Sequence, residues 1–195
     1  PAVSDIPQIN CVFSQEGDDR KPFERDETTL ARPWIRPGTP GLENRVGGLE
    51  KAEVTGNVSY DPMNHERMVQ LREDKIKGIA RTYTPLEVYG PSEGVVLVLG
   101  WGSTRGAIRG AVERFHREGK EVSHVHLRNV WPLPLDLGEI LGRFQKVVIP
   151  ELNLGQLNRI IRSEYLIDTI SLPKVQGKPY GSEELFVKIQ NILKE

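Results

Sequence analysis

The sequence predicts an α/β fold with a mainly parallel sheet in residues 86–195, and two observations carry this prediction. Five short apolar stretches with the pattern of β-strands recur in this part of the chain, and segments with helical periodicity separate them. Right-handed crossovers between such strands place helices on both faces of the sheet. Ligands bind such sheets at the carboxyl ends of the strands, where turns begin at Gly100, Arg128 and Glu151.

The strands are expected at residues 86–89, 95–99, 122–127, 146–151 and 168–172. Between them, apolar residues return with the spacing of a helix that buries one face. The last helix follows Ser182, and acidic residues in its first turn suit the positive end of the helix dipole. The apolar faces of the expected helices are Ala107, Ile108, Ala111, Val112 and Phe115; Leu137, Ile140 and Leu141; Leu157, Ile160, Ile161 and Tyr165; and Leu185, Phe186, Ile189 and Ile192.

Residues 1–61 are expected to form an extended arm. Prolines and glycines interrupt every periodic pattern there, and the charged run EGDDRKPFERDE lies within it. Such a segment is better suited to lie on another surface than to form a core. Scattered apolar residues would anchor the arm: Val12, Phe13, Phe23, Trp34 and Ile35.

Residues 62–85 are expected to form a connecting helix and a linker. Asp61 can cap the helix, and Pro62 suits its first position. The helix is expected to end near residue 79, before the sequence YTP, and residues 86–195 then form the α/β domain. A narrow apolar stripe marks the inner side of the helix: Met68, Leu71, Ile76 and Ile79.

Composition excludes several classes of function. The 195 residues carry a formal net charge of −1 with a pI near 6.6, so no overall positive field would attract nucleic acid or an anionic membrane. The longest apolar run, 95–99, is too short to cross a bilayer and no signal-peptide pattern is present, so we expect a cytoplasmic protein. The single cysteine, Cys11, excludes an internal disulfide and a four-thiolate cluster. Because the chain starts at Pro1, we expect a piece of a longer polypeptide or a processed chain.

The stretch VLVLGWGSTRGAIRG, residues 96–110, places a glycine turn between a strand and a helix, where a dinucleotide fingerprint would lie. Its glycines, Gly100, Gly102 and Gly106, have the spacing G-x-G-x-x-x-G, one residue longer than the fingerprint. The next strand ends in Arg128 and Asn129 instead of the acid that would bind a ribose. A structural turn is therefore favoured, and an independent Rossmann-like nucleotide-binding module is kept as the alternative.

The same turn could also bind a simpler anion. A helix N-terminus exposes amide donors, which attract a carboxylate or a phosphate. Ser103 and Thr104 could cap these amides, and Arg105 lies next to them. Because most helix starts are only capped, the anion site is the lesser alternative.

Polar residues also follow two later strands. Arg128 follows one of them, and Glu151, Asn153 and Gln156 flank the turn PELNLGQLNR before the next helix. Glu151 could contact a substrate, but a carboxylate beside free amide donors more often caps its own helix. Capping is therefore the favoured interpretation.

Two further groups of residues have ordinary explanations. His124 and His126 face the same side of a strand and could bind a metal, but no third ligand with suitable spacing follows. Trp34 between Arg32 and Arg36 could clamp a dicarboxylate, but a tryptophan anchor with solvated arginines is favoured. The sequence contains no self-sufficient catalytic motif, so neither a catalytic nor a metal-binding residue is predicted.

Five longer motifs resemble one protein family in the same order along the chain. They are TGNVSYDPMNHERMVQLREDKI, LVLGWGSTRGAIRGAV, VSHVHLRNVWPLP, IPELNLGQLNRIIRSEYLID and KVQGKPY. Over residues 30–195 the chain resembles the C-terminal portion of the alpha subunit of 2-oxoacid:ferredoxin oxidoreductases. The likeness is to the 2-oxoglutarate branch, 2-oxoglutarate synthase.

The resemblance implies that residues 86–195 form a transketolase C-terminal-like domain. Its three α/β/α layers would contain a five-stranded, mostly parallel sheet whose first strand, LEVY, is antiparallel. It also implies an intact enzyme that uses thiamine diphosphate, Mg²⁺ and iron–sulfur clusters. That enzyme interconverts a 2-oxoacid and CoA with acyl-CoA, CO₂ and reduced ferredoxin.

The resemblance further implies that this chain is a noncatalytic interface domain that is inactive alone. The family's diphosphate-and-magnesium motif and its cluster cysteines do not occur in this sequence, so we expect the chain to bind no cofactor by itself. Its partners would be the remaining alpha-subunit domains, a beta subunit and ferredoxin, in a dimer of heterodimers. A pure assembly module without any ligand is a weaker alternative. Candidates for contact with a ligand or an interface are Gly102, Ser103, Thr104, Arg105, Arg128, Glu151, Asn153 and Gln156.

Overall fold

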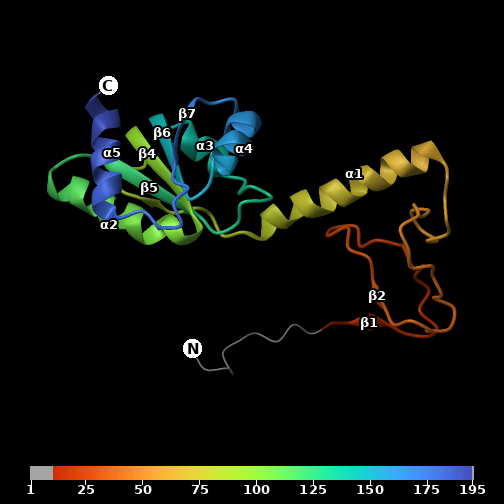
Figure 1. Cartoon of the computed structure of the whole chain (residues 1–195). Helices are drawn as coiled ribbons and strands as arrows, with labels where there is room; N and C mark the ends of the chain where they lie inside the picture. Colours follow the sequence, from red (N-terminus) through yellow and green to blue (C-terminus); the bar gives the residue numbers. More distant parts are fainter. Residues whose placement is uncertain (1–10, 195) are drawn as a thin grey trace. The chain divides into compact units, whose positions relative to one another are not determined.

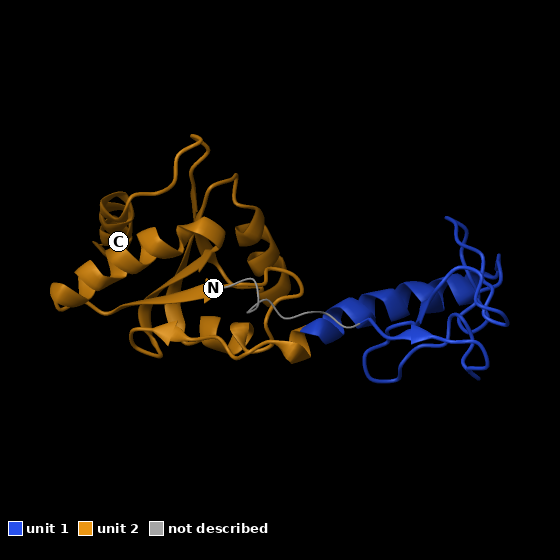
Figure 2. Ribbon diagram, turned by 90° about the horizontal axis from the view of Figure 1, so that it is seen from below, with its two compact units in different colours: residues 1–79 blue, residues 80–195 orange. Residues whose placement is uncertain are grey.

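A computed structural model describes residues 11–194, so the first ten residues of the expected arm lie outside the described part. The chain divides into two compact units, residues 1–79 and residues 80–195 (Figure 2). Contacts thus group the helix at 62–78 with the residues that precede it.

The first unit consists mainly of turns and one long helix. Strands β1 (Phe13–Ser14) and β2 (Trp34–Ile35) form a short parallel pair, and helix α1 spans Pro62–Gly78. Asp61 caps α1 as expected, because its carboxylate accepts a hydrogen bond from the amide of Met63 at 3.0 Å.

A small apolar cluster joins the expected arm to α1. Phe23 is buried against Met68 and Leu71, and Leu30 packs at the edge. The irregular segment therefore contributes to a core, although its pattern predicted none. Among the other expected anchors, Trp34 and Val12 remain exposed, as do Ile76 and Ile79 of the expected helical stripe.

Glu50 attaches the loop before α1 to the helix. Its carboxylate accepts hydrogen bonds from both terminal nitrogens of Arg72 at 3.2 Å, and lies 2.7 Å from Nδ1 of His65. The hydrogen bonds from Arg72 and His65 lower the pKa of Glu50 to about 2. The polar contacts complement the small apolar cluster of this unit.

The second unit contains the sheet that the sequence predicts. Its strand order is β3-β5-β4-β6-β7, with β3 antiparallel to β5 and the other neighbours parallel (Figure 1). This confirms the α/β class and the five-stranded, mostly parallel sheet. The strands are β3 (Val88–Tyr89), β4 (Gly94–Trp101), β5 (Val122–Leu127), β6 (Phe144–Glu151) and β7 (Thr169–Pro173).

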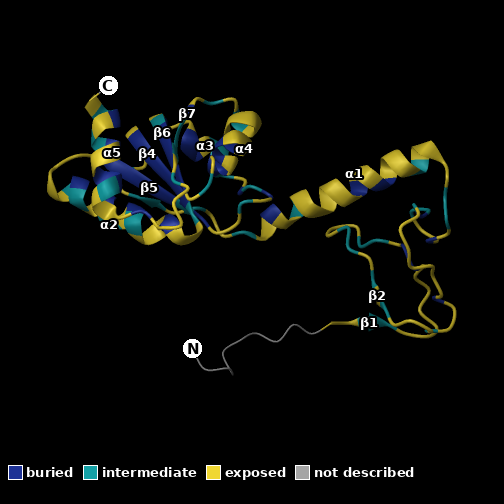
Figure 3. Cartoon of the chain, viewed as in Figure 1, coloured by how far each residue is buried: buried dark blue, intermediate teal, exposed yellow. Residues whose placement is uncertain are grey.

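Helices cover both faces of this sheet, which makes three layers. Helices α2 (Arg105–Arg117) and α5 (Ser182–Lys194) pack on one face, and α3 (Leu137–Leu141) and α4 (Gln156–Tyr165) pack on the other (Figure 1). Strand β4 shows why: Val96 and Val98 point into the first core, while Leu97 and Leu99 point into the second. The central strands are accordingly buried between exposed outer helix faces (Figure 3).

Within residues 11–194, no helix combines the length and the apolar character needed to span a bilayer.

Candidate functional site

The candidate residues gather at two helix starts on the carboxyl edge of the sheet. One turn joins β4 to α2 and contains Gly102, Ser103, Thr104 and Arg105. The other joins β6 to α4 and contains the remaining candidates except Arg128, which follows β5. The side chains of the two turns use their hydrogen-bonding groups in different ways.

The turn before α2 is held together by Thr104, which is buried. A 3₁₀ turn spans Gly102–Thr104, and the Thr104 hydroxyl donates to the carbonyl of Trp101 at 2.8 Å. The same hydroxyl accepts from the Trp101 amide at 3.2 Å, and it makes no capping bond to α2. Thr104, which the sequence offered as a possible cap, does not cap α2, because its hydroxyl is used within the turn. Ser103 and Arg105 are exposed, and Gly102 has a left-handed φ of +57°.

The first glycine of this turn has a packing role. A Cβ at Gly100 would lie 2.4 Å from Cδ1 of Ile108, a fully buried residue of α2, and 3.2 Å from Nδ1 of His126. Helix α2 can thus approach β4 closely only because Gly100 has no side chain. This accounts for Gly100 without a nucleotide phosphate.

The turn before α4 is closed by its own side chains. Glu151 is fully buried, and its two carboxylate oxygens accept from the amides of Leu157 at 2.9 Å and Asn158 at 3.0 Å. Asn153 Oδ1 accepts from the amides of Gly155 at 2.8 Å and Gln156 at 3.0 Å. The first amides of α4 are therefore occupied, and Glu151 caps its own helix as the sequence favoured.

A cavity of about 750 Å³ opens at the start of α2, within the second unit. It brings together Arg105 and Arg128, which the sequence singled out, with Arg109, which it did not. A signal for Arg109 was available, since it follows Arg105 by four residues and shares its helix face. The cavity is also lined by Tyr83, Leu86, Glu87, Tyr89, Gly106, His124, His126 and Pro134.

Two histidines form the inner wall of this cavity. His124 is only 4% exposed, and burial, aided by His126 and nearby arginines, lowers its pKa to about 4. Burial also lowers the pKa of His126, as do Arg105 and Arg128. Both imidazoles are therefore mainly neutral at pH 7. Nε2 of His124 and Nδ1 of His126 are buried and have no hydrogen-bond partner in the described part of the chain.

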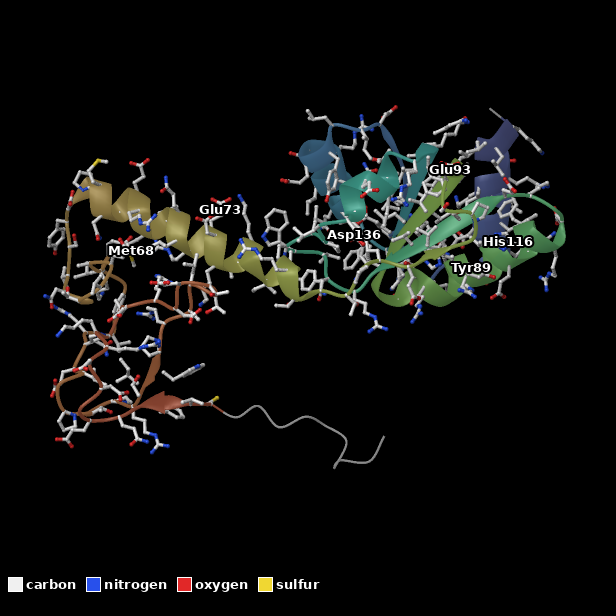
Figure 4. All side chains as sticks on the ribbon, turned by 180° about the vertical axis from the view of Figure 1, so that it is seen from behind. Met68, Glu73, Tyr89, Glu93, His116 and Asp136 are labelled. Carbon is white, nitrogen blue, oxygen red and sulfur yellow. The ribbon has the colours of Figure 1, made fainter. Side chains whose placement is uncertain are left out.

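The arginines differ in what already binds them. Arg109 stacks on the ring of Tyr89, 3.0 Å from its centroid, and donates from Nε to Glu113 at 2.9 Å. Tyr89 in turn lies beside His116 (Figure 4). The side chains of Arg105 and Arg128 make no hydrogen bond or ion pair to another described residue. These two guanidiniums are free to bind a ligand.

The histidine pair does not form a metal site in the described residues. No group of three or more His, Cys, Asp or Glu side chains there is placed to hold a metal ion. Since zinc sites in proteins use three or four such ligands, the pair alone does not fit one.

Comparisons with known proteins are decisive for the family. The chain is 47% identical, over 95% of its length, to the 2-oxoglutarate oxidoreductase subunit KorA of Mycobacterium tuberculosis. It is 30% identical, over 97% of its length, to the alpha subunit of the 2-oxoacid:ferredoxin oxidoreductase 1 of Aeropyrum pernix. The chain belongs to the alpha-subunit family of 2-oxoacid:ferredoxin oxidoreductases. No family model matches it.

A solved structure supports the fold of this alpha-subunit chain. The structure of 2-oxoglutarate:ferredoxin oxidoreductase from Magnetococcus marinus, with 2-oxoglutarate, coenzyme A and succinyl-CoA bound, matches 98% of the chain with a TM-score of 0.87 at 32% identity. The chain spans 34% of that protein, 28% of the M. tuberculosis relative and 30% of the A. pernix relative. It thus matches about a third of an alpha subunit.

The residues of this chain do not fit an iron–sulfur cluster of the alpha-subunit family's oxidoreductases. Such clusters need several cysteine thiolates, and the sequence has the single Cys11, which is exposed.

Proposed function

We propose that the chain is the C-terminal portion of the alpha subunit of a 2-oxoglutarate:ferredoxin oxidoreductase, and that its role is to assemble the enzyme. The enzyme would act in the cytoplasm and interconvert 2-oxoglutarate and CoA with succinyl-CoA, CO₂ and reduced ferredoxin. Identity of 47% with a 2-oxoglutarate oxidoreductase subunit, over almost the whole chain, supports this proposal most directly. Thiamine diphosphate, Mg²⁺ and iron–sulfur clusters would be bound by other parts of the complex.

Exposed apolar side chains on the second unit support the assembly role. They lie in the loops after β5 and β6, whose parallel strands end at the same edge of the sheet. Leu135 is 73% exposed and Leu154 is 70% exposed, and Trp131 and Leu152 add to them. Apolar side chains grouped in this way mark a protein contact. We assign this edge to the remaining alpha-subunit domains or the beta subunit, in a dimer of heterodimers.

The capped N-terminus of α4 supports a noncatalytic role for its residues. The side-chain oxygens of Glu151 and Asn153 already accept hydrogen bonds from the amides of the turn. The Glu151 carboxylate is therefore not positioned to exchange a proton with a substrate. Arg105 and Arg128 are the candidates left for contact with a ligand or a partner.

Reconstitution tests this proposal. The remaining part of the alpha subunit and the beta subunit would be produced with and without this chain, and 2-oxoglutarate-dependent ferredoxin reduction measured. We expect activity only when all parts are present. Leu135→Asp together with Leu154→Asp should abolish co-purification, whereas Leu166→Asp, which alters another exposed leucine, should not. Full activity without this chain would contradict the proposal.

Calorimetry with NAD, ATP and CoA separates this function from the nucleotide-binding alternative. The alternative requires micromolar binding that is lost in Gly102→Val and Thr104→Ala but retained in Arg128→Gln. We expect no such pattern, since the Thr104 hydroxyl is occupied by Trp101 and no acidic residue ends β5.

A further inference from the structure

We propose that the cavity at the start of α2 binds a small organic molecule that carries a phosphate or carboxylate group, held between Arg105 and Arg128. The ligand is assigned to this chain alone. The inference therefore goes beyond the assembly role and does not depend on it.

Charge is the first argument. Three arginines line the cavity and Glu87 is the one carboxylate in its wall. Arg109 is already neutralised by Glu113 at 2.9 Å, which leaves the positive charges of Arg105 and Arg128. Asp136, which does not line the cavity, accepts from the amide of Leu86 at 2.7 Å. Glu87 offsets one of these charges, so the wall keeps a net positive charge, and neither guanidinium has an ion-pair partner among the described residues. This favours an anion, because arginine pairs with carboxylates and phosphates through several parallel hydrogen bonds.

Buried and unpartnered nitrogens are the second, independent argument. His124 is more than nine-tenths buried, lines the cavity, and leaves Nε2 without a hydrogen bond in the described residues. Nδ1 of His126 is in the same state beside it, and the two ring centroids are 5.7 Å apart. Buried polar atoms in folded proteins are nearly all satisfied. A neutral His124 imidazole with its proton on Nε2 can donate one hydrogen bond, which an oxygen of a bound anion would accept. His126 already donates to the backbone of Gly102, so its Nδ1 can only accept, for example from a hydroxyl of the ligand.

The helix start adds to this site rather than defining it. Helix α2 has 13 residues, and its N-cap residue, Thr104, makes no capping bond. No side chain at the N-cap therefore competes with a ligand there, and the helix dipole favours negative charge at this end. Gly106 in the same turn lines the cavity, and a Cβ at this position would meet nothing within 4 Å.

The size and the walls of the cavity indicate an organic ligand. About 750 Å³ is in the range of sites for small molecules and leaves room beside an isolated phosphate ion. Apart from its charged residues, the wall contains apolar and aromatic side chains: Tyr83, Pro85, Leu86, Tyr89 and Pro134. A molecule with an apolar or aromatic body and one anionic group matches both kinds of lining.

NMR titration of the full 195-residue chain tests the proposal. Phenyl phosphate and benzoate are the organic probes, one for each anionic group, and inorganic phosphate and benzyl alcohol lack one half of the proposed ligand. We expect saturable shifts of the His124 and His126 ring signals with at least one organic anion, and weaker binding of both controls. Absence of saturable shifts with both organic anions would overturn the proposal.

Three variants locate the binding. Arg105→Gln and Arg128→Gln should each weaken binding about tenfold, since each removes a charge-assisted hydrogen bond. Gly106→Leu should abolish binding by filling the open space beside the helix. Arg117→Gln is the matched control, because it removes one charge from the far end of α2 and should leave the dissociation constant unchanged.

Two outcomes of the variant series would overturn the proposal. If Arg117→Gln and Arg128→Gln weakened binding of the probe equally, the chain would attract the anion by its overall charge and not bind it at a defined site. Unchanged affinity in both Arg105→Gln and Arg128→Gln would place the probe elsewhere. These two exposed positions decide the question even if Gly106→Leu does not fold, which amide signal dispersion will show.

Discussion

The two helix starts at the carboxyl edge of the sheet differ in how their first amides are used. At α4, Glu151 and Asn153 bind four successive amides with side chains from the same turn. At α2, the N-cap side chain binds back into its own turn, and a cavity lined by arginines lies beside the helix. We call the N-terminus of α4, whose amides are capped, the sealed start, and the N-terminus of α2, beside the cavity, the open start.

This difference teaches that position in an α/β fold does not by itself make a ligand site. Both turns follow a central parallel strand, where ligands bind in such sheets. We assign an anion to the turn before α2, whose N-cap side chain makes no capping bond and which lies beside the arginines of the cavity.

Glu151→Ala has the largest expected effect. It would leave the buried amides of Leu157 and Asn158 without acceptors, and we expect a loss of about 4 kcal/mol in the free energy of unfolding. Urea unfolding followed by NMR signals of the second unit measures this loss. Glu151→Gln keeps one carbonyl acceptor and should lose less than half as much. Equal losses in the two variants would contradict the capping role.

His124, beside the open start, should make the free energy of unfolding of the second unit depend on pH in the acid range. Its pKa of about 4 in the folded chain lies below the ordinary value of 6.5, so the unfolded chain binds more protons between these pH values. Stability should therefore fall as the pH is lowered from 6.5 to 4, by about 3 kcal/mol at most. His124→Gln should remove this part of the pH dependence. An identical fall in the variant would show that other groups are responsible.

Gly155→Ala should be costly at the sealed start. Gly155 has a φ of +82°, and an added Cβ would lie 2.8 Å from Oγ of Ser171, so we expect a loss of about 2 kcal/mol. Gly106→Ala is the matched change at the open start, where the helical backbone and free space should keep the effect within about 1 kcal/mol. Thermal unfolding of both variants compares them, and a reversed order would contradict the structure.

Asn153→Ala should have a smaller effect than Gly155→Ala. The amides of Gly155 and Gln156 would lose the acceptor that they share. Because Gln156 is exposed, a water molecule can take the place of that acceptor, and we expect a loss of about 1 kcal/mol in the free energy of unfolding. Ser103→Ala at the open start removes an exposed hydroxyl and should cost less. Urea unfolding of both variants, monitored by NMR signals of the second unit, measures the two losses. A larger loss in Ser103→Ala than in Asn153→Ala would contradict this prediction.

The sequence predicted the fold more fully than the site. Alternation such as Val96 and Leu97 along β4 reveals a strand buried on both faces, and β5 was expected at its observed bounds, 122–127. Local patterns also favoured the capping role of Glu151. They did not settle the partner of Thr104, because its hydroxyl can bond either within its own turn or to the next helix, and the structure shows both bonds going to Trp101.

The expected arm, residues 1–61, shows the same limit of prediction from local sequence patterns. Proline and glycine made residues 1–61 look unable to form a core, yet Phe23 packs on Met68 and Leu71 of α1. A contact between residues more than 40 positions apart leaves no periodic signal in either segment. The sequence alone therefore identified the candidate anchors but not which of them is buried.

By itself, the sequence determined the order and type of the elements of residues 80–195, because strand and helix periodicity are local properties of the chain. It also determined which residues stand at the strand ends. Only the tertiary structure decided that Arg105, Arg109 and Arg128 line one cavity with His124, while Glu151 is enclosed. The physical reason is that the free or occupied state of a polar group depends on neighbours that chain folding brings together.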